Sequence, residues 1–277
     1  QTITLYSERD KICTTEMWHE VNSQKEGYIK RKEHFSEDKR EVIYSGPHIG
    51  VANPIFKCSR NICKLNSDYD NIDLSVIPDN YTQRCNYIPD CRIDVYKNKI
   101  TDTSWNTKVD EVYRVIARKM LNQSGERTLI SSIISPVTTH INGLISFIFK
   151  DYEKMILSSG LWSSIPYDYM IKTIGKANLN FDSVSSLPIM NSRYNKVIIA
   201  RSLLLNCIST LYAPLWKECF DESFLQEIWS KQDSRLDNKR FSSLTSEWNW
   251  NTPLRTDYER RQALVEIDVL TAMALGM

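Results

Sequence analysis

The segment TLISSII at residues 128–134 decides the fold class that the sequence predicts. Ile and Thr are β-branched and favour strands, and Ser does not favour helix interiors, so the segment predicts a strand that ends before Pro136. The residues before it follow a different period, because apolar side chains recur at spacings of three and four from Val109 to Leu121. That spacing predicts an amphipathic helix over residues 106–121. A helix followed directly by a strand indicates a mixed architecture.

Further elements follow on either side of this segment. Residues 141–149 (INGLISFIF) form a short apolar run that predicts either a buried strand or a short helix, because periodicity cannot separate the two. The spacing of Thr256 and Glu259 fits a capping box and predicts the start of the last helix. Residues 42–44 form a short apolar segment, short strands are predicted at 72–77 and 87–89, and a helical stripe at 197–215. The expected fold is α+β with a helical C-terminal layer, divided into residues 1–123, 124–192 and 193–277.

The composition restricts the class of protein. With 277 residues, of which 42% are apolar, the chain is long enough for one or two domains with a real core. Its formal net charge of +1 provides no overall attraction to DNA or to a membrane, so a basic surface would have to be local. Seven cysteines are an odd number, no secretory leader is recognisable, and no apolar run approaches the roughly 18 residues of a membrane span. These features predict a reduced, cytoplasmic protein with no membrane partner.

Four cysteines form two pairs that resemble a zinc site in outline. Cys58 and Cys63 have four residues between them, and Cys85 and Cys91 have five. Structural zinc sites more often have two to four residues within a pair. Because unpaired Cys is among the most buried residue types, we predict buried free thiols and no metal, with zinc as the alternative.

The residues Asn53-Pro54-Ile55-Phe56 resemble the catalytic motif of adenine-N6 methyltransferases. In that motif an amide and a backbone carbonyl accept from the exocyclic amine of a flipped adenine, while an aromatic ring stacks on the base. Here Ile55 stands where the motif has a second Pro, and the eight Gly residues are isolated, so no Gly-rich turn is present for S-adenosylmethionine. We therefore predict a local turn, in which Pro54 restricts φ and Asn53 bonds to nearby backbone, with no catalytic residue and no cofactor in this chain.

Nuclease and hydrolase motifs are also incomplete. Asp94 and Lys97 are three residues apart, whereas a metal-dependent nuclease carries its acidic residue and Lys two apart on one face of a strand. The four histidines are far apart in the sequence, and none is paired with a nucleophile in a known motif. The sequence therefore predicts no self-sufficient active site.

Five short motifs occur in one order and carry a family resemblance. They are Glu126-Arg127-Thr128, Ser135-Pro136, Asp168-Tyr169 with Lys172, Leu179-Asn180-Phe181 and Leu187-Pro188. In this order they are similar to the target-recognition region of type IIG adenine-N6 DNA methyltransferases, which act in restriction-modification and phage defence. The resemblance covers residues 45–277 and is strongest over 127–188, with Ser135 standing where Ile is commoner. It implies a target-recognition domain with its core at residues 124–192 and with Glu126-Arg127-Thr128 on a strand.

The resemblance also implies partners. Double-stranded DNA would be the ligand, and a methyltransferase domain upstream in the same polypeptide would hold S-adenosylmethionine. The sequence starts at Gln1 and stops at Met277 just after an apolar-periodic helix, which fits a piece of a longer enzyme. Two alternatives are a zinc-stabilised protein-interaction module and an enzyme fragment in which residues 53–56 are catalytic.

A DNA-specificity module needs Lys and Arg to neutralise phosphates, and Arg or Asn to read base edges. The candidates for positioning DNA are Lys57, Arg60, Lys172 and Lys176, and those for reading it are Arg84, Asn86, Asn178 and Asn180. For each of them the alternative is an ordinary surface side chain. Arg127 is expected either to touch DNA or to form an internal ion pair with the neighbouring Glu126, since a buried Arg needs a partner.

Overall fold

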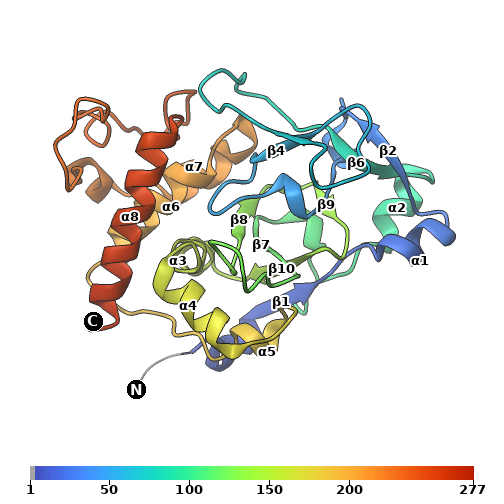
Figure 1. Cartoon of the computed structure of the whole chain (residues 1–277), viewed down its shortest axis with the longest axis horizontal. Helices are drawn as coiled ribbons and strands as arrows, with labels where there is room; N and C mark the ends of the chain where they lie inside the picture. The colour runs from blue at the N-terminus through green and yellow to red at the C-terminus, as the bar shows by residue number, and fades with distance from the viewer. Residues whose placement is uncertain (1–3) are drawn as a thin grey trace.

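A four-stranded antiparallel sheet lies at the centre of the molecule (Figure 1), and the computed structural model describes residues 4–277. In spatial order the strands are β1 (Ile12–Thr15), β10 (Leu144–Phe149), β7 (Arg114–Arg118) and β8 (Ser131–Ile134). The strand predicted from residue 128 is therefore confirmed from Ser131 onward, and the apolar run at 141–149 is a strand. The boundary placed between residues 123 and 124 passes through this sheet, because β7 and β8 pair across it.

The helix predicted over residues 106–121 is wrong. A single 3₁₀ turn, Val109–Glu111, is followed by the strand β7. Val115 and Ala117 face the main core beneath the helices, whereas Ile116 belongs to a second buried cluster with Val42 on the opposite face of the sheet. A strand that is buried on both faces carries apolar residues at consecutive positions, as Val115, Ile116 and Ala117 do here, so its centre lacks the regular alternation of a half-exposed strand.

Three two-stranded pairs surround one side of the central sheet. The pair β2 (Ile29–His34) with β6 (Cys85–Pro89) and the pair β4 (Lys57–Ser59) with β5 (Tyr69–Asn71) are antiparallel, and β3 (Ile43–Tyr44) runs parallel to β9 (Thr139–His140). The strand predicted at 87–89 is confirmed as part of β6, and the apolar segment at 42–44 contributes the strand β3. The strand predicted at 72–77 is wrong, because the Asp73 carboxylate accepts from the Ser75 backbone N–H at 2.9 Å and from its hydroxyl at 2.6 Å, which closes a turn.

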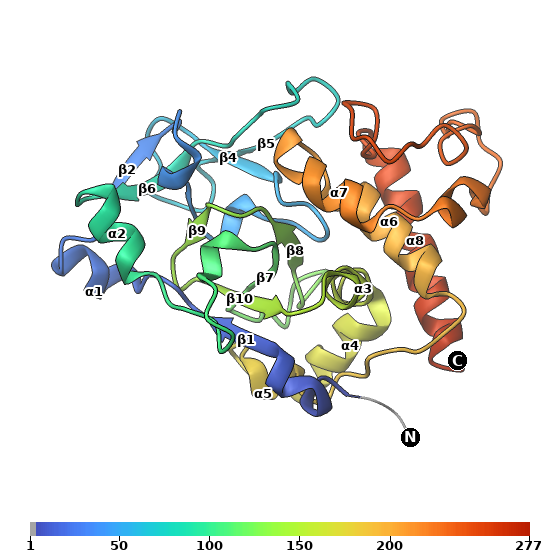
Figure 2. The same ribbon diagram turned by 180° about the vertical axis from the view of Figure 1, so that it is seen from behind.

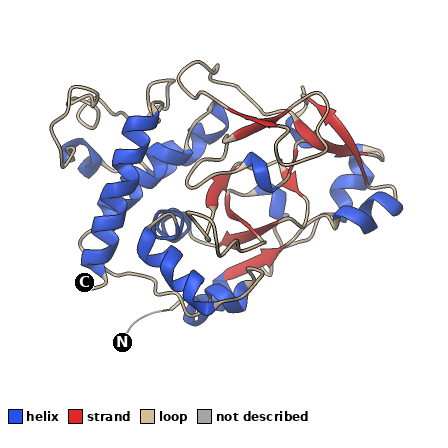
Figure 3. Ribbon diagram, viewed as in Figure 1, coloured by secondary structure: helices blue, strands red, loops and turns tan. Residues whose placement is uncertain are grey.

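Most of the helices, drawn in blue in Figure 3, gather on the side of the sheet away from β2 and β6. The helices are α1 (Glu20–Lys25), α2 (Ile93–Lys99), α3 (Tyr152–Trp162), α4 (Ile165–Ile174), α5 (Phe181–Val184), α6 (Asn195–Asn206), α7 (Ala213–Cys219) and α8 (Asp257–Ala274). Helices α1 and α2 lie beside the β2–β6 pair. This arrangement confirms the α+β class and the helical C-terminal layer. In residues 4–277 no helix has the length and apolar character needed to span a bilayer.

Helix α3 packs between the central sheet and α6, as both views show (Figures 1 and 2). Gly160 makes this packing close, because a Cβ atom there would lie 2.7 Å from Cγ2 of Ile198. Phe147 of the sheet meets Trp162 edge to face, with ring centroids 4.9 Å apart. The main hydrophobic core therefore lies between the helix-facing side of the sheet and the helical layer.

The last helix begins as its sequence predicts. The Thr256 side chain accepts from the Glu259 backbone N–H at 3.3 Å, and Glu259 in turn accepts from the Thr256 backbone N–H at 3.4 Å. The helical stripe predicted at 197–215 is confirmed for α6 and α7 but breaks between them. Asn206 ends α6 and accepts with Oδ1 from the Ile133 backbone N–H at 2.8 Å, and Pro214 lies in the first turn of α7.

Candidate nucleic-acid interface

A polar cavity of about 510 Å³ lies between the β2–β6 pair, the β4–β5 pair and the turns after β7 and before β10. Its walls come from residues 20–31, 45–47, 57–69, 86–87, 118–122 and 141–143. These segments meet only because the small strand pairs fold over one face of the central sheet (Figure 2). We call this space the polar cavity.

The lining of the polar cavity is basic. Arg31, Lys57, Lys64 and Arg118 line it, and Glu20 is the only acidic residue among the residues that do. The Glu20 carboxylate accepts a hydrogen bond from the hydroxyl of Tyr87, which also lines the cavity, and it forms no ion pair with the four cations. A concave wall that gathers like charges concentrates their field, so the polar cavity attracts anions although the whole chain carries a formal charge of only +1.

Arg118 has no carboxylate partner among the described residues. Its guanidinium donates to the Ile49 carbonyl at 2.6 Å, and its Nε has no hydrogen-bond partner within residues 4–277. Burial lowers its pKa, and no carboxylate of residues 4–277 opposes this shift. Arg31 also relies on neutral groups, donating to the Cys63 carbonyl at 2.6 Å and lying over the Tyr87 ring. Both guanidinium groups therefore line the polar cavity without a carboxylate partner in the described residues.

Asn86 forms part of the cavity wall and does not match its predicted role. It is 1% exposed, and its Nδ2 donates both to the Tyr69 hydroxyl at 2.8 Å and to Cys63 Sγ at 3.1 Å. Its Oδ1 accepts from the same tyrosine at 3.1 Å. Since both N–H groups are used inside the protein, Asn86 positions Tyr69 and leaves no free donor for a base edge.

His48 supports this wall from behind. Its Nδ1 accepts from the Ser45 backbone N–H at 3.0 Å, so its Nε2 carries the proton and donates to the Arg84 carbonyl at 3.1 Å. Burial lowers the pKa of His48 to about 4. The imidazole is therefore neutral at physiological pH and acts as a fixed link between the turn before the cavity and β6.

The first predicted cluster lies along β4 and the start of β6. The Lys57 ammonium lines the polar cavity and lies over the Phe56 ring. Arg60 is exposed but forms a two-pronged ion pair with Asp70, with a shortest distance of 2.7 Å. Arg84 lies over the ring of Phe35 with its guanidinium carbon 4.4 Å from the ring centroid. Only Lys57 of this cluster therefore faces the polar cavity with no carboxylate partner in the described residues.

The second predicted cluster lies beside the rim of the same cavity. Lys172, Lys176, Asn178 and Asn180 are exposed, on the last turn of α4 and the loop to α5. Two backbone hydrogen bonds join this loop to the turn after β7. The Leu121 N–H donates to the Ala177 carbonyl at 2.9 Å, and the Leu179 N–H donates to the Lys119 carbonyl at 2.7 Å. The cavity residues Met120 and Asn122 belong to that turn. The structure thus places this loop next to the polar cavity that Lys57 lines.

Asn178 and Asn180 differ within this loop. Asn180 is the N-cap of α5, and its Oδ1 accepts from the Ser183 backbone N–H at 2.9 Å and from the Ser183 hydroxyl at 2.8 Å. The Asn178 carbonyl accepts from the same hydroxyl at 3.4 Å, whereas its side-chain amide has no hydrogen-bond partner in the described chain. Asn178 is therefore the freer of the two amides.

The residues 126–128 differ from their prediction in two ways. First, they lie in a loop before β8 and not on a strand. The buried Asp168 carboxylate holds this loop, because it accepts from the backbone N–H groups of Thr128 and Leu129 at 2.7 and 2.6 Å. Arg127 pairs with Asp268 of α8 at 3.8 Å, whereas Glu126 is exposed. The internal ion pair thus exists with a different partner, which is 141 positions away in the sequence and joins the loop to the last helix.

The motif at residues 53–56 forms the predicted local turn. The Asn53 Oδ1 accepts from the Ile55 backbone N–H at 3.0 Å, and Pro54 is buried with its carbonyl accepting from Gln83 Nε2 at 3.0 Å. The amide oxygen of Asn53 is therefore used within the turn.

The four cysteines of the zinc hypothesis contact different neighbours, and Cys63 Sγ accepts from Asn86 Nδ2 at 3.1 Å. Cys58 Sγ accepts from the Arg84 backbone N–H at 3.3 Å, Cys85 is buried, and Cys91 lies beside the Tyr28 carbonyl. Across the described residues, no group of three or more His, Cys, Asp or Glu side chains is placed to hold a metal ion.

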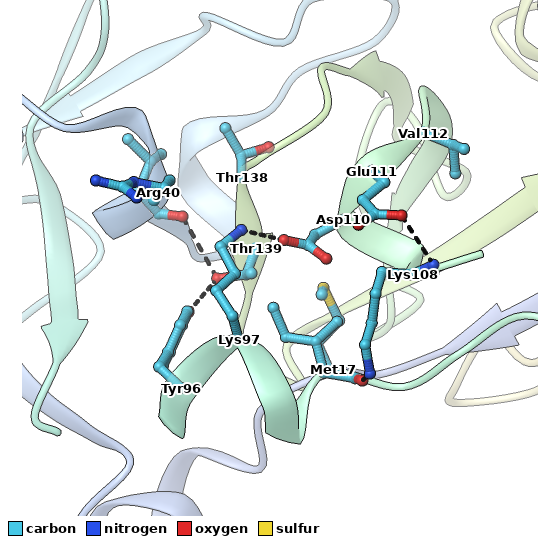
Figure 4. A network of polar contacts seen from close by, with 12 residues as sticks. Met17, Arg40, Tyr96, Lys97, Lys108, Asp110, Glu111, Val112, Thr138 and Thr139 are labelled. Carbon is cyan, nitrogen blue, oxygen red and sulfur yellow. Dashed lines mark hydrogen bonds and ion pairs between the residues drawn. The ribbon is translucent and has the colours of Figure 1, made fainter. Parts of the chain in front are cut away.

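The segment that contains Asp94 and Lys97 is helix α2, not a strand of the kind that carries a nuclease motif. Lys97 points toward the buried Asp110 and pairs with it, while the neighbouring Tyr96 hydroxyl meets the Thr139 hydroxyl at 2.6 Å (Figure 4). Asp94 instead accepts from the exposed Arg92 side chain. Asp94 and Lys97 therefore contact different residues and do not act together as a pair.

Sequence reasoning missed Arg31, Lys64 and Arg118. The first two lie in ordinary polar stretches that carry no distinguishing pattern. Arg118 lies two residues after Ile116 on β7 and so on the same strand face, but the helix predicted for this segment did not place it there. No protein-family model matches this chain, and a search of curated proteins finds no match either.

Proposed function

We propose that this chain is the DNA target-recognition module of an S-adenosylmethionine-dependent adenine-N6 DNA methyltransferase that acts in restriction-modification or phage defence. The observation that carries the proposal is the basic polar cavity, in which Arg31 and Arg118 have no carboxylate partner among the described residues. Double-stranded DNA carries one negative charge for about every 1.7 Å of its axis, so a local basic surface can bind it despite a near-neutral chain. The methyl donor would bind in an upstream domain of the same polypeptide.

The polar cavity and the loop before α5 supply complementary contacts for this function. Lys57 and Lys64 would contact phosphates on one strand of DNA, and Lys176 would contact the backbone beyond the rim. Asn178 has the side chain suited to reading adenine, since an amide can pair with both N6 and N7 in the major groove. Arg60 and Lys172 flank this surface, with the charge of Arg60 already balanced by Asp70.

Charge reversal tests the positioning contacts. The double variant Lys57→Glu/Lys176→Glu should weaken binding about equally on all duplexes, because phosphate contacts carry no sequence information. The slope of log affinity against log salt should flatten by about 0.9 for each phosphate that the protein no longer neutralises. Binding is measured by fluorescence anisotropy over a salt series, with a duplex selected from a random pool and a scrambled duplex.

The matched control reverses two exposed lysines elsewhere, in Lys150→Glu/Lys239→Glu, neither of which takes part in an ion pair in the described chain. This control should leave the salt slope unchanged. An equal loss of affinity in both double variants would mean that net charge alone matters, and an unchanged slope in the Lys57 and Lys176 variant would place the DNA surface elsewhere.

Asn178→Ala tests the reading contact. Removal of an amide that bonds twice to a base should cost about 1 to 3 kcal/mol on the selected duplex and much less on scrambled DNA. Asn180→Ser provides the comparison, because Ser can replace Asn as the N-cap of α5 without supplying an amide. A uniform loss of affinity on both duplexes in Asn178→Ala would show that this side chain does not read sequence.

This chain on its own should not bind S-adenosylmethionine. The reason is the absence from its sequence of a Gly-rich strand-to-helix turn that lets backbone approach the cofactor. Isothermal titration calorimetry with S-adenosylmethionine should show no saturable heat. Saturable binding, or transfer of a methyl group to adenine in duplex DNA, would assign the catalytic step to this chain.

A further inference from the structure

A second cavity lies between the turn at residues 73–77 and the helical layer. Its volume is about 410 Å³, and three arginines contribute to its wall. The residues of interest are Ser234, Arg235, Arg240, Trp250 and Arg255. None of them lines the polar cavity described above. We call this space the arginine cavity.

Arg255 is the central residue of the arginine cavity. The residue is 5% exposed, and its Nε donates to the Trp250 carbonyl at 3.1 Å and its Nη1 to the Leu74 carbonyl at 3.4 Å. Its Nη2 has no hydrogen-bond partner in the part of the chain that the structure describes. A buried guanidinium normally has a carboxylate partner, because its charge is costly to remove from water. Here neutral carbonyl groups are the acceptors that the described residues supply.

Three carboxylates at or beside the arginine cavity already accept hydrogen bonds, and one of them, Asp237, accepts from the Lys239 backbone N–H at 2.9 Å. Glu259 accepts from Arg240 at 2.9 Å and from the Thr256 hydroxyl at 2.9 Å, and Asp233 accepts from Arg235 at 2.8 Å. Burial and then the positive charge of Arg240 lower the pKa of Arg255 to about 10. The arginine cavity therefore brings together two guanidinium groups that repel each other. Arg240 forms an ion pair with Glu259, whereas Asp79 acts on Arg255 only through its charge and forms no hydrogen bond with it in the described residues.

Trp250 gives the arginine cavity an aromatic side. The guanidinium carbon of Arg255 lies 4.6 Å from the centre of the Trp250 ring, and the tryptophan is 37% exposed. Stacking uses the face of the guanidinium and leaves its N–H edges to bind other groups. Guanidinium edges match the paired oxygens of a phosphate.

We propose that the arginine cavity is a binding site for a phosphate group, held between Arg240 and Arg255 beside Trp250. A phosphate supplies the negative charge that Arg255 lacks and separates the two guanidinium groups. The volume falls within the range of about 300 to 1,000 Å³ that is usual for small-molecule sites, so a nucleoside monophosphate fits as well as inorganic phosphate. The proposal does not depend on the DNA function assigned to the polar cavity.

The test is isothermal titration calorimetry of the whole chain with inorganic phosphate and with deoxyadenosine monophosphate. Saturable binding is expected, and Ser234→Glu should weaken it by about tenfold or more, because a carboxylate placed at the cavity competes for the guanidinium groups. Arg255→Gln should weaken it to a similar degree. The matched control is Ser186→Glu, since Ser186 is also an exposed serine with no side-chain hydrogen bond in the described chain.

The source of the phosphate is identified by competition. Displacement of bound deoxyadenosine monophosphate by a short DNA duplex identifies the DNA backbone as the source. The duplex concentrations are those at which the Ser234→Glu variant does not bind the duplex. Displacement by free nucleotides alone identifies a small nucleotide, and either result supports a phosphate site. Absence of saturable binding, or an equal loss of affinity in Ser234→Glu and Ser186→Glu, would overturn the proposal. If Arg255→Gln does not fold, the comparison of Ser234→Glu with Ser186→Glu still tests the proposal, because both serines are exposed.

Discussion

Replacing Arg201 with methionine is expected to lower the free energy of unfolding by about 3 to 5 kcal/mol, because it leaves a buried carboxylate without its cation. Arg201 of α6 donates to Glu266 of α8 at 2.6 Å and to Glu227 at 2.9 Å, and the side chains of Arg201 and Glu266 are 4% and 5% exposed. Burial would raise the pKa of Glu266, but Arg201, Gln262 and Ser230 hold it below its usual value. The ion pair therefore joins two helices of the C-terminal layer.

Urea unfolding measures this effect, and an exposed ion pair supplies the control. Lys217 and Glu247 are 2.5 Å apart but 63% and 72% exposed, so Lys217→Met should cost less than about 1 kcal/mol. The double variant Arg201→Met/Glu266→Leu should recover much of the stability, because it removes the unpaired charge together with its partner. A cost for Arg201→Met no larger than that for Lys217→Met would show that the buried pair is not a stabilising link.

Acidification from pH 7 to pH 4 is expected to destabilise the fold by several kcal/mol through two buried histidines. Burial lowers the pKa of His48 to about 4 and that of His140 to about 3, below the ordinary value of 6.5. Both are neutral in the folded state, whereas the unfolded chain binds protons once the pH falls below about 6.5. Stability is therefore full above that pH and falls by about 1.4 kcal/mol for each pH unit and each histidine, down to the folded pKa values.

The pH dependence of urea unfolding between pH 7 and pH 4 tests this expectation. His140→Asn should be less stable at neutral pH, because it loses the hydrogen bond to the Ser146 hydroxyl at 2.7 Å, but its stability should change less steeply with pH. The control is His19→Asn, since His19 is an exposed N-cap of α1 and Asn caps a helix equally well. A slope in His140→Asn that equals the slope of the unchanged protein would assign the acid sensitivity to other groups.

Local interactions explain which elements could be predicted from the sequence. Thr256 and Glu259 satisfy each other's backbone within three residues, and Asn53 bonds two residues ahead, so neither contact needs the rest of the fold. The β-branched residues of β8 likewise favour a strand before any packing occurs. By contrast β7 is buried on both faces, and only the sheet shows that its apolar residues belong to two different cores.

The sequence by itself determined the α+β class, the capped start of α8 and the turn at Asn53, because these depend on residues close together in the chain. Only the tertiary structure decided that Arg127 pairs with Asp268 and not with Glu126, since that contact joins a loop to the last helix. The same holds for the polar cavity and the arginine cavity. Their charges come from distant segments, and whether Arg118 or Arg255 has a carboxylate partner depends on how those segments pack.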